Sequence, residues 1–127
     1  MKLKFRRLPG RSAVCRWPAD AAIPEWSLNG LPSSITRTRD ELSIVCGVEN
    51  IPPEHVPEAA WICLKREGPF ALSQVGILAS FIDPLRDSSV PIFAISTYDR
   101  DYVLVGEEFS QAALAALPMV GHELVAN

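Results

Sequence analysis

No stretch of the chain reaches the run of about 18 consecutive apolar residues that a membrane-spanning helix needs. Arg6 and Arg7 interrupt the apolar residues after the basic start, so the sequence does not predict a secretory signal peptide. Its three cysteines, Cys15, Cys46 and Cys63, form no close pair and have no histidine at metal-ligand spacing, which argues against a disulfide framework and a zinc site. We therefore expect a cytoplasmic protein with reduced, buried thiols, no membrane contact, no metal and no cofactor.

The motifs of common catalytic centres are also missing. The sequence contains no Walker loop, no H-E-x-x-H, no G-x-S-x-G and no C-x-x-C. A nucleophile needs a base within reach. His55 lies in a proline-rich segment and His122 begins the last expected strand, and neither belongs to a motif centred on Ser or Cys. We interpret both as surface or capping histidines. We expect no enzymatic activity.

What the chain does have is enough apolar material for a core and an uneven distribution of charge. With 127 residues, 48% of them hydrophobic, it forms one domain or two very small ones that share a core. Residues 1–39 carry eight Lys and Arg against two acids, and residues 40–127 carry four against thirteen. The basic start could be a nucleic-acid patch, but KLKFRR lacks the interleaved aromatic residues of a stacking platform. A solvated strand face is favoured, and no nucleic-acid partner is expected.

The N-terminal half reads as short strands separated by prolines. Residues 2–17 are extended, with a turn at Pro9-Gly10, and residues 24–28 allow one helical turn. Residues 33–38 and 42–48 form a plausible antiparallel hairpin. A second helical turn or a linker begins at Pro52-Pro53.

The C-terminal half has a cleaner pattern. It predicts a strand over 60–66, a helix with one apolar face over 72–85, strands over 91–98 and 102–105, a helix capped by Ser110 that runs to about Leu117, and a strand over 120–125. Pro84 should kink or stop the first helix near Ile82, because proline lacks a donor and clashes with the carbonyl of Ser80.

The resulting order from residue 60 is βαββαβ. Right-handed crossovers turn this order into a four-stranded antiparallel sheet with both helices on one face, the ferredoxin-like arrangement. The fold class is therefore α+β. The other face of the sheet has to be covered, and the N-terminal strands or a second copy of the chain are the available covers.

Two segments carry a resemblance to a known family. They are WICLKREGPFALSQVGILASFIDPL and VPIFAISTYDRDYVLV. Together they resemble the ACT domain family of regulatory modules that bind small molecules, and the second is similar to the ACT pairs of a bacterial family related to the cytosolic arginine sensors of animal cells. The resemblance implies an ACT domain over residues 58–127, preceded over residues 1–57 by a degenerate, helix-poor and β-rich ACT-like half.

The resemblance also implies a place for a ligand, and it implies that this ligand is an amino acid. ACT domains bind such ligands between the loop after the first strand and the edge of a neighbouring sheet, commonly across a dimer interface, so a homodimer is expected. The loop here comprises Glu67, Gly68, Pro69, Phe70 and Ala71, and the helix opens at Leu72 or Ser73.

Physical chemistry suits these residues to a zwitterion. A helix N-terminus offers unpaired N–H groups to a carboxylate, and Gly68 permits a close approach of backbone. Asp99 and Asp101 are candidates for the ligand's ammonium group, with Ser96 and Thr97 as hydrogen-bonding groups.

A purely structural interpretation remains open beside this one. Phe70 adds bulk where small residues are frequent in the family, so its side chain either stacks over a ligand or fills the ligand's place. In the second case the chain is a module for protein–protein interaction or oligomerisation with a vestigial pocket. The hairpin residues then serve only as turn and strand formers.

Overall fold

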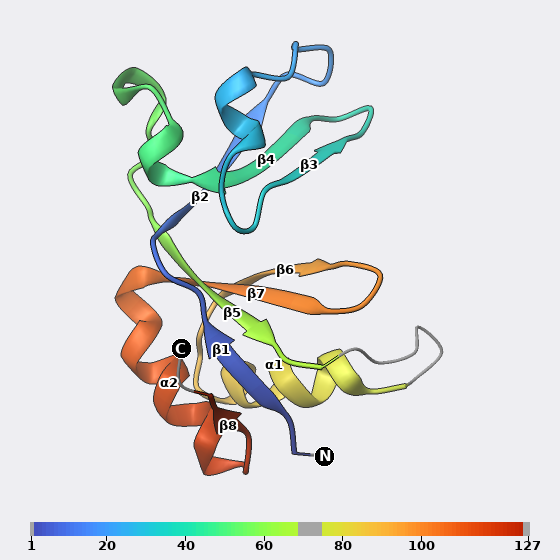
Figure 1. Ribbon diagram of the computed structural model, residues 1–127, viewed down its shortest axis with the longest axis vertical. Coiled ribbons are helices and arrows are strands. Elements are labelled where there is room, and N and C mark those ends of the chain that lie inside the picture. The colour runs from blue at the N-terminus through green and yellow to red at the C-terminus, as the bar shows by residue number, and fades with distance from the viewer. Residues whose placement is uncertain (1, 69–74, 126–127) are drawn as a thin grey trace. The chain divides into compact units, whose positions relative to one another are not determined.

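The computed structural model describes residues 2–68 and 75–125 and divides into two compact units (Figure 1). One unit combines Met1–Pro9 with Ile62–Asn127, and the other is Gly10–Trp61. The sequence suggested a division into residues 1–57 and 58–127. The observed units differ from it chiefly because the first nine residues join the C-terminal part of the chain.

The C-terminal unit has the expected βαββαβ order and is an α+β, ferredoxin-like fold. Its elements are β5 (Trp61–Arg66), α1 (Ile77–Asp87), β6 (Ile92–Ser96), β7 (Asp101–Gly106), the 3-10 turn η4 (Glu107–Phe109), α2 (Ser110–Met119) and β8 (Glu123–Leu124), together with β1 (Lys4–Arg7) from the N-terminus. Strands β6 and β7 form an antiparallel hairpin, in which Phe93 pairs with Leu104.

Strand β1 changes the sheet that the sequence predicted. The strand order is β8-β1-β5-β7-β6, so β1 separates the first and last strands of the βαββαβ unit (Figure 1). It is antiparallel to β5, with Phe5 opposite Arg66, and parallel to β8, with Phe5 opposite Leu124. The expectation of a four-stranded, wholly antiparallel sheet is therefore wrong. β8 has only two residues, too few to pair with the length of β5, and β1 supplies that pairing instead.

A single apolar core lies between this sheet and the two helices. The alternation of the strands turns Phe5, Ile62, Leu64, Val103 and Val105 to this side, and all five are buried. Phe5 meets Phe81 of α1 edge to face, with ring centroids 5.5 Å apart. The remaining buried members of the cluster are Leu3, Ile77, Leu85, Val90, Ala113 and Leu117. The prediction of both helices on one face is confirmed.

Helix α1 begins and ends later than the sequence predicted. It starts at Ile77 after Gly76, whose φ of 82° is in the left-handed region, and Val75 is outside the helix and 88% exposed. The predicted opening at Leu72 or Ser73 lies outside the described residues. The helix also passes through Pro84 and ends at Asp87 rather than stopping near Ile82.

The tolerance of Pro84 has a physical reason in His122. Pro84 cannot donate to the carbonyl oxygen of Ser80, and the Nε2 atom of His122 lies 2.8 Å from that oxygen. The Nδ1 atom of His122 accepts a hydrogen bond of 3.0 Å from the N–H of Leu3, so its Nε2 is the atom that donates. His122 is 3% exposed. It is therefore a buried link between α1 and the N-terminal residues, and not a surface histidine.

The ends of α2 and β8 also differ from the prediction. Ser110 is the first helical residue and not the cap, because the turn η4 leads directly into the helix, whose N-cap is Phe109 without a side-chain hydrogen bond. The helix continues to Met119, with Pro118 in its last turn. The last strand is shortened accordingly.

The unit Gly10–Trp61 is built on three strands. β4 (Leu42–Gly47) is antiparallel to both β2 (Ser12–Trp17) and β3 (Ser34–Arg37), which confirms the predicted hairpin. Three 3-10 turns complete it: η1 (Glu25–Leu28), η2 (Val48–Asn50) and η3 (Pro53–His55). Residues 10–61 are all described and contain no α-helix. Their core consists of Ala13, Cys15, Leu42, Ile44, Cys46 and Ile51.

The three cysteines are free and buried, as the sequence predicted. Burial raises the pKa of Cys63 to about 12 and that of Cys46 to about 11, and it also raises the pKa of Cys15. Within residues 2–68 and 75–125, no helix is long and apolar enough to cross a membrane.

The link through His122 predicts a coupling between two residues far apart in sequence. His122→Ala leaves the Leu3 N–H and the Ser80 carbonyl without this partner and should lower the free energy of unfolding by about 2–4 kcal/mol. In a Pro84→Ala background residue 84 can donate to Ser80, so the same substitution should cost about 1 kcal/mol less. Urea unfolding of the wild type, the two single variants and the double variant measures this coupling. An equal loss of unfolding free energy from His122→Ala in both backgrounds would contradict it.

Candidate functional site

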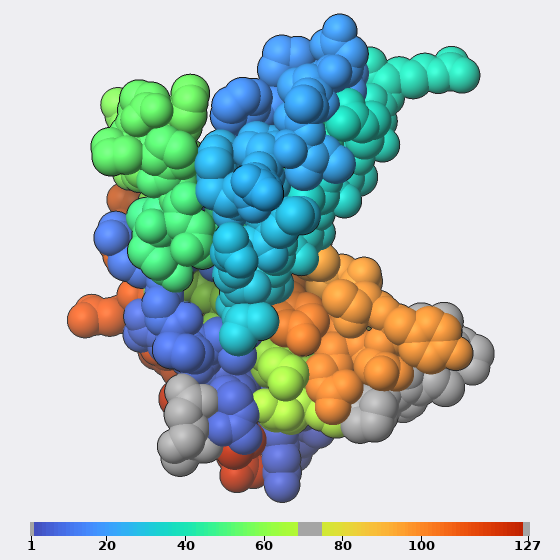
Figure 2. Space-filling view, turned by 45° about the horizontal axis from the view of Figure 1, so that its top comes forward, coloured from blue at the N-terminus to red at the C-terminus, as the bar shows by residue number. Residues whose placement is uncertain are grey.

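The β6–β7 hairpin is closed by a tight turn between Thr97 and Arg100. The N–H of Thr97 donates to the carbonyl oxygen of Arg100 at 2.8 Å. The Thr97 hydroxyl donates to the same oxygen at 3.0 Å and accepts from the N–H of Arg100 at 3.2 Å. Tyr98 and Asp99 form the tip, which is exposed on the surface of the unit (orange in Figure 2).

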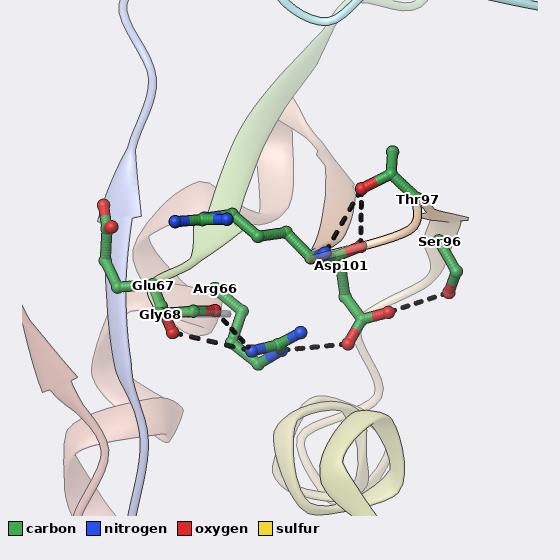
Figure 3. A network of polar contacts seen from close by, with 7 residues as sticks. Arg66, Glu67, Gly68, Ser96, Thr97 and Asp101 are labelled. Atoms are coloured by element: carbon green, nitrogen blue, oxygen red, sulfur yellow. Dashed lines mark hydrogen bonds and ion pairs between the residues drawn. The ribbon is translucent and has the colours of Figure 1, made fainter. Parts of the chain in front are cut away.

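A nearly buried ion pair lies at the base of this turn. Asp101 opens β7, and its Oδ2 accepts from Nε of Arg66, the last residue of β5, at 2.9 Å (Figure 3). The side chains are 4% exposed for Arg66 and 13% for Asp101. The second carboxylate oxygen, Oδ1, accepts from the hydroxyl of Ser96 at 2.8 Å. Both oxygens of Asp101 therefore have a partner within the chain.

Arg66 also holds the start of the loop that leads toward α1. Its Nη1 donates to the carbonyl oxygen of Gly68 at 3.2 Å and lies 3.5 Å from that of Glu67 (Figure 3). Gly68 has a φ of 82°, a left-handed conformation that glycine adopts without steric cost. One guanidinium group thus joins the end of β5, the first residues of the loop and the β6–β7 hairpin.

The position of Arg66 follows from the alternation of β5, although the sequence reading missed it. Ile62 and Leu64 point into the core, and Arg66 continues the same period of two opposite the buried Phe5. A buried guanidinium requires a partner, and Asp101 provides it. An arginine at a core-facing position of a strand was the signal that could have revealed this pair.

A second ion pair lies on the other face of the sheet. Arg6 of β1 pairs with Lys65 in the β-ladder, and its Nε donates to Oε1 of Glu67 at 2.6 Å. The hydrogen bond from Arg6 is the main cause that lowers the pKa of Glu67 below its usual 4.5, and the charges of Lys65 and Arg100 lower it further.

The structure brings together some of the residues predicted for the site. Gly68, Ser96 and Asp101 are joined through Arg66, whereas Thr97 is engaged in the turn and Asp99 is exposed at its tip. Pro69, Phe70, Ala71 and Ser73 lie outside the described residues.

No metal cluster marks this corner in the described residues. An apolar groove of about 300 Å³ lies elsewhere in the C-terminal unit and is lined by Ile82, Asp83, Arg86, Val90 and Ile92, none of them a predicted site residue. Among residues 2–68 and 75–125, no group of three or more His, Cys, Asp or Glu side chains is placed to hold a metal ion.

Comparison with known proteins places this arrangement in a family. The family model of the ACT domain matches residues 56–118, and a second model, for an N-terminal domain, matches residues 10–54. A crystal structure from Agobacterium tumefaciens is 37% identical, with a TM-score of 0.88, over 100% of this chain and 95% of that one. The chain belongs to the ACT domain family, whose members are regulatory modules that bind small molecules.

More distant structures share the fold. A Vibrio cholerae protein of unknown function, described as a possible transport protein, has 20% identity and a TM-score of 0.77 over 99% of this chain and 92% of that one. The aspartate kinase of Clostridium acetobutylicum, an allosteric enzyme, has 12% identity and a TM-score of 0.62 over 92% of this chain and 33% of the kinase.

The buried ion pair predicts a difference between two arginines. Arg66→Met leaves Asp101 without its cation in a nearly buried position and should lower the free energy of unfolding by about 3 kcal/mol. Arg86 pairs with Asp83 and Asp87 on the surface, so Arg86→Met should change it little. Urea denaturation compares the two variants, and an equal effect of both would show that the Arg66 pair does not stabilise the fold.

The lowered pKa of Glu67 predicts a loss of stability in acid. A carboxylate whose pKa is depressed on folding stabilises the folded state above its unfolded pKa, and this contribution disappears as the pH falls through the folded value. The stability difference between wild type and Glu67→Gln should therefore be largest near pH 7 and should shrink below about pH 4.5. Arg6→Gln removes the main cause of the shift and should flatten the same profile. Parallel curves for wild type and Glu67→Gln from pH 7 to 3 would contradict this assignment.

Proposed function

We propose that this protein is a cytoplasmic, non-catalytic sensor that binds an amino acid at the corner between the β5–α1 loop and the β6–β7 hairpin, and that it acts as a homodimer. The observation that supports this site is the Arg66–Asp101 pair, which connects the loop to the hairpin. Two segments that would contact a ligand from different sides are thereby held in one place before the ligand arrives, which reduces the entropic cost of binding.

The charges at this corner suit a zwitterion. The start of α1 at Ile77 offers unpaired backbone N–H groups to a carboxylate, and the hairpin offers Asp99 and Asp101 to an ammonium group. Each carboxylate oxygen has two lone pairs, so Asp101 can accept from a ligand while keeping Arg66 and Ser96. Pro69, Phe70, Ala71, Ser73 and Thr97 complete the proposed set.

Regulation follows if the ligand prefers one of two arrangements of the loop. A ligand shifts such an equilibrium only by the difference between its affinities for the two states. Arg66 donates a hydrogen bond to Gly68 at the start of the loop. A ligand that changes the conformation of the loop would therefore also affect the contact of Arg66 with Asp101 of the hairpin. We further propose that the N-terminal half is a degenerate ACT-like unit that takes part in the response.

One observation favours a second candidate, an interaction module with a vestigial pocket. Both oxygens of Asp101 already have partners, and the hydroxyl of Thr97 is used within the turn. These groups satisfy one another without a ligand. In this alternative the corner is a structural joint, and the chain acts through pairing with itself or with another protein.

A thermal-shift screen against the twenty amino acids, nucleotides and common metabolites separates the two candidates. A ligand at 100 times its dissociation constant should stabilise the native state by about 2.7 kcal/mol, which raises the unfolding midpoint measurably. Asp99→Ala should reduce this gain without a large change in the ligand-free midpoint, because Asp99 is exposed. Asp101→Ala should abolish the gain but should also lower the ligand-free midpoint, since it breaks the pair with Arg66. A flat screen would contradict the sensor and favour the interaction module.

A further inference from the structure

Three basic side chains lie in a row on the face of the sheet that points away from the helices. Arg6, Lys65 and Arg100 belong to or adjoin β1, β5 and β7, which are consecutive in the sheet. Arg6 and Lys65 are direct partners in the ladder. Because neighbouring residues of a strand point to opposite faces, Lys65 lies opposite in direction to Arg66, and Arg100 to Asp101.

The row carries more positive than negative charge. Glu67 is paired with Arg6 at 2.6 Å, while within the described residues neither Lys65 nor Arg100 makes an ion pair with a side chain. Arg6, Lys65 and Arg100 all lie close enough to Glu67 for their charges to lower the pKa of its carboxyl group. The balance of the cluster is an excess of two positive charges, contributed by Lys65 and Arg100.

Arg100 has a further feature that a solvated surface arginine lacks. Its Nε is buried and has no hydrogen-bond partner in the described residues, although the residue as a whole is half-buried. A buried N–H without a partner is unfavourable, and such a group in a native protein commonly marks the place of a missing water or ion. The guanidinium fork of arginine is also well matched to carboxylate and phosphate.

We propose that Arg100 and Lys65 bind an anionic group of the ligand, a carboxylate or a phosphate. This inference rests on the proposed sensor function and specifies its substrate class: an amino acid with an acidic side chain. Such a ligand has a second negative charge that a neutral amino acid lacks, and Arg100 and Lys65 are the partners that we assign to it. Its acidic side chain reaches Arg100 and Lys65, and its ammonium group lies toward Asp99, which adjoins Arg100 at the exposed tip of the hairpin.

Position supports the assignment. Arg100 stands in the chain between the two aspartates proposed for the ammonium group, and Lys65 and Glu67 flank Arg66. The anion receptor therefore adjoins the exposed tip of the hairpin, whereas Asp101 points to the opposite face, toward Arg66. The pair between Arg6 and Glu67 neutralises the outer end of the row, so the excess charge is concentrated at Lys65 and Arg100.

Titration calorimetry with matched ligands tests this inference. The probes are aspartate and glutamate, their neutral amides asparagine and glutamine, arginine, and inorganic phosphate. We expect aspartate or glutamate to bind at least tenfold more tightly than its amide, and to lose that advantage in Arg100→Gln and in Lys65→Met. Affinity should fall as the salt concentration rises. Arg39→Gln removes the same charge from an exposed turn of the other unit and should behave as wild type.

The possible outcomes separate this inference from the proposed function. Arg100→Gln should unfold at the wild-type midpoint, because the Nε it removes has no partner, so a loss of binding is not a loss of fold. If a neutral or basic amino acid binds equally to wild type and Arg100→Gln, the anion inference is wrong and the sensor stands. If only phosphate binds, and Arg100→Gln abolishes that binding, the anion receptor stands and the amino-acid sensor fails. If no probe binds, both fail.

Discussion

The buried guanidinium of Arg66 is the constraint on which this corner of the protein depends. A cation that is 3% exposed is tolerated in an apolar sheet only when its charge is compensated and its donors are used. Asp101 compensates the charge, and the carbonyl oxygen of Gly68 uses a second donor. Strand β7 therefore begins at Asp101, whose carboxylate pairs with Arg66. The loop after β5 begins with the carbonyl groups of Glu67 and Gly68 turned toward the same guanidinium group. Strand end, loop and hairpin are positioned by one side chain.

The second constraint is that the ferredoxin-like unit is not continuous in the chain. Strand β1 comes from the N-terminus, lies between β5 and β8, and places Leu3 and Phe5 in the core. His122, just before β8, accepts a hydrogen bond from the N–H of Leu3. It also donates to the carbonyl oxygen of Ser80, to which Pro84 cannot donate. The backbone donor that Pro84 lacks within α1 is thus replaced by the side chain of His122, close to the C-terminal end of the unit. The N-terminal residues are as much a part of this unit as its own strands.

Local patterns were sufficient to predict most elements but not their pairing. The order βαββαβ, the hairpins and the turns at Pro24 and Pro52 follow from alternation, apolar spacing and proline positions, which are properties of neighbouring residues. The insertion of β1 was missed because strand pairing between residues 5 and 66 leaves no local signal. The length of α1 was misjudged for a similar reason: the donor that makes Pro84 tolerable is 42 residues away from Ser80. Of the residues joined at this corner, the sequence indicated Gly68, Ser96 and Asp101, but not the arginine that joins them.

Beside Arg66, the two faces of the sheet differ in how far their positive and negative charges neutralise each other. This difference affects which charged ligands the proposed site would select. On the face toward the helices, Arg66 and Asp101 neutralise each other. On the opposite face, no carboxylate of residues 2–68 or 75–125 forms an ion pair with Lys65 or Arg100, which lie beside the pair of Arg6 and Glu67. A charged group of a ligand gains more binding free energy from a protein charge that is not already paired than from one that is. In the binding mode that we propose, the anionic end of the ligand therefore contributes most to discrimination, while its ammonium group mainly fixes its orientation.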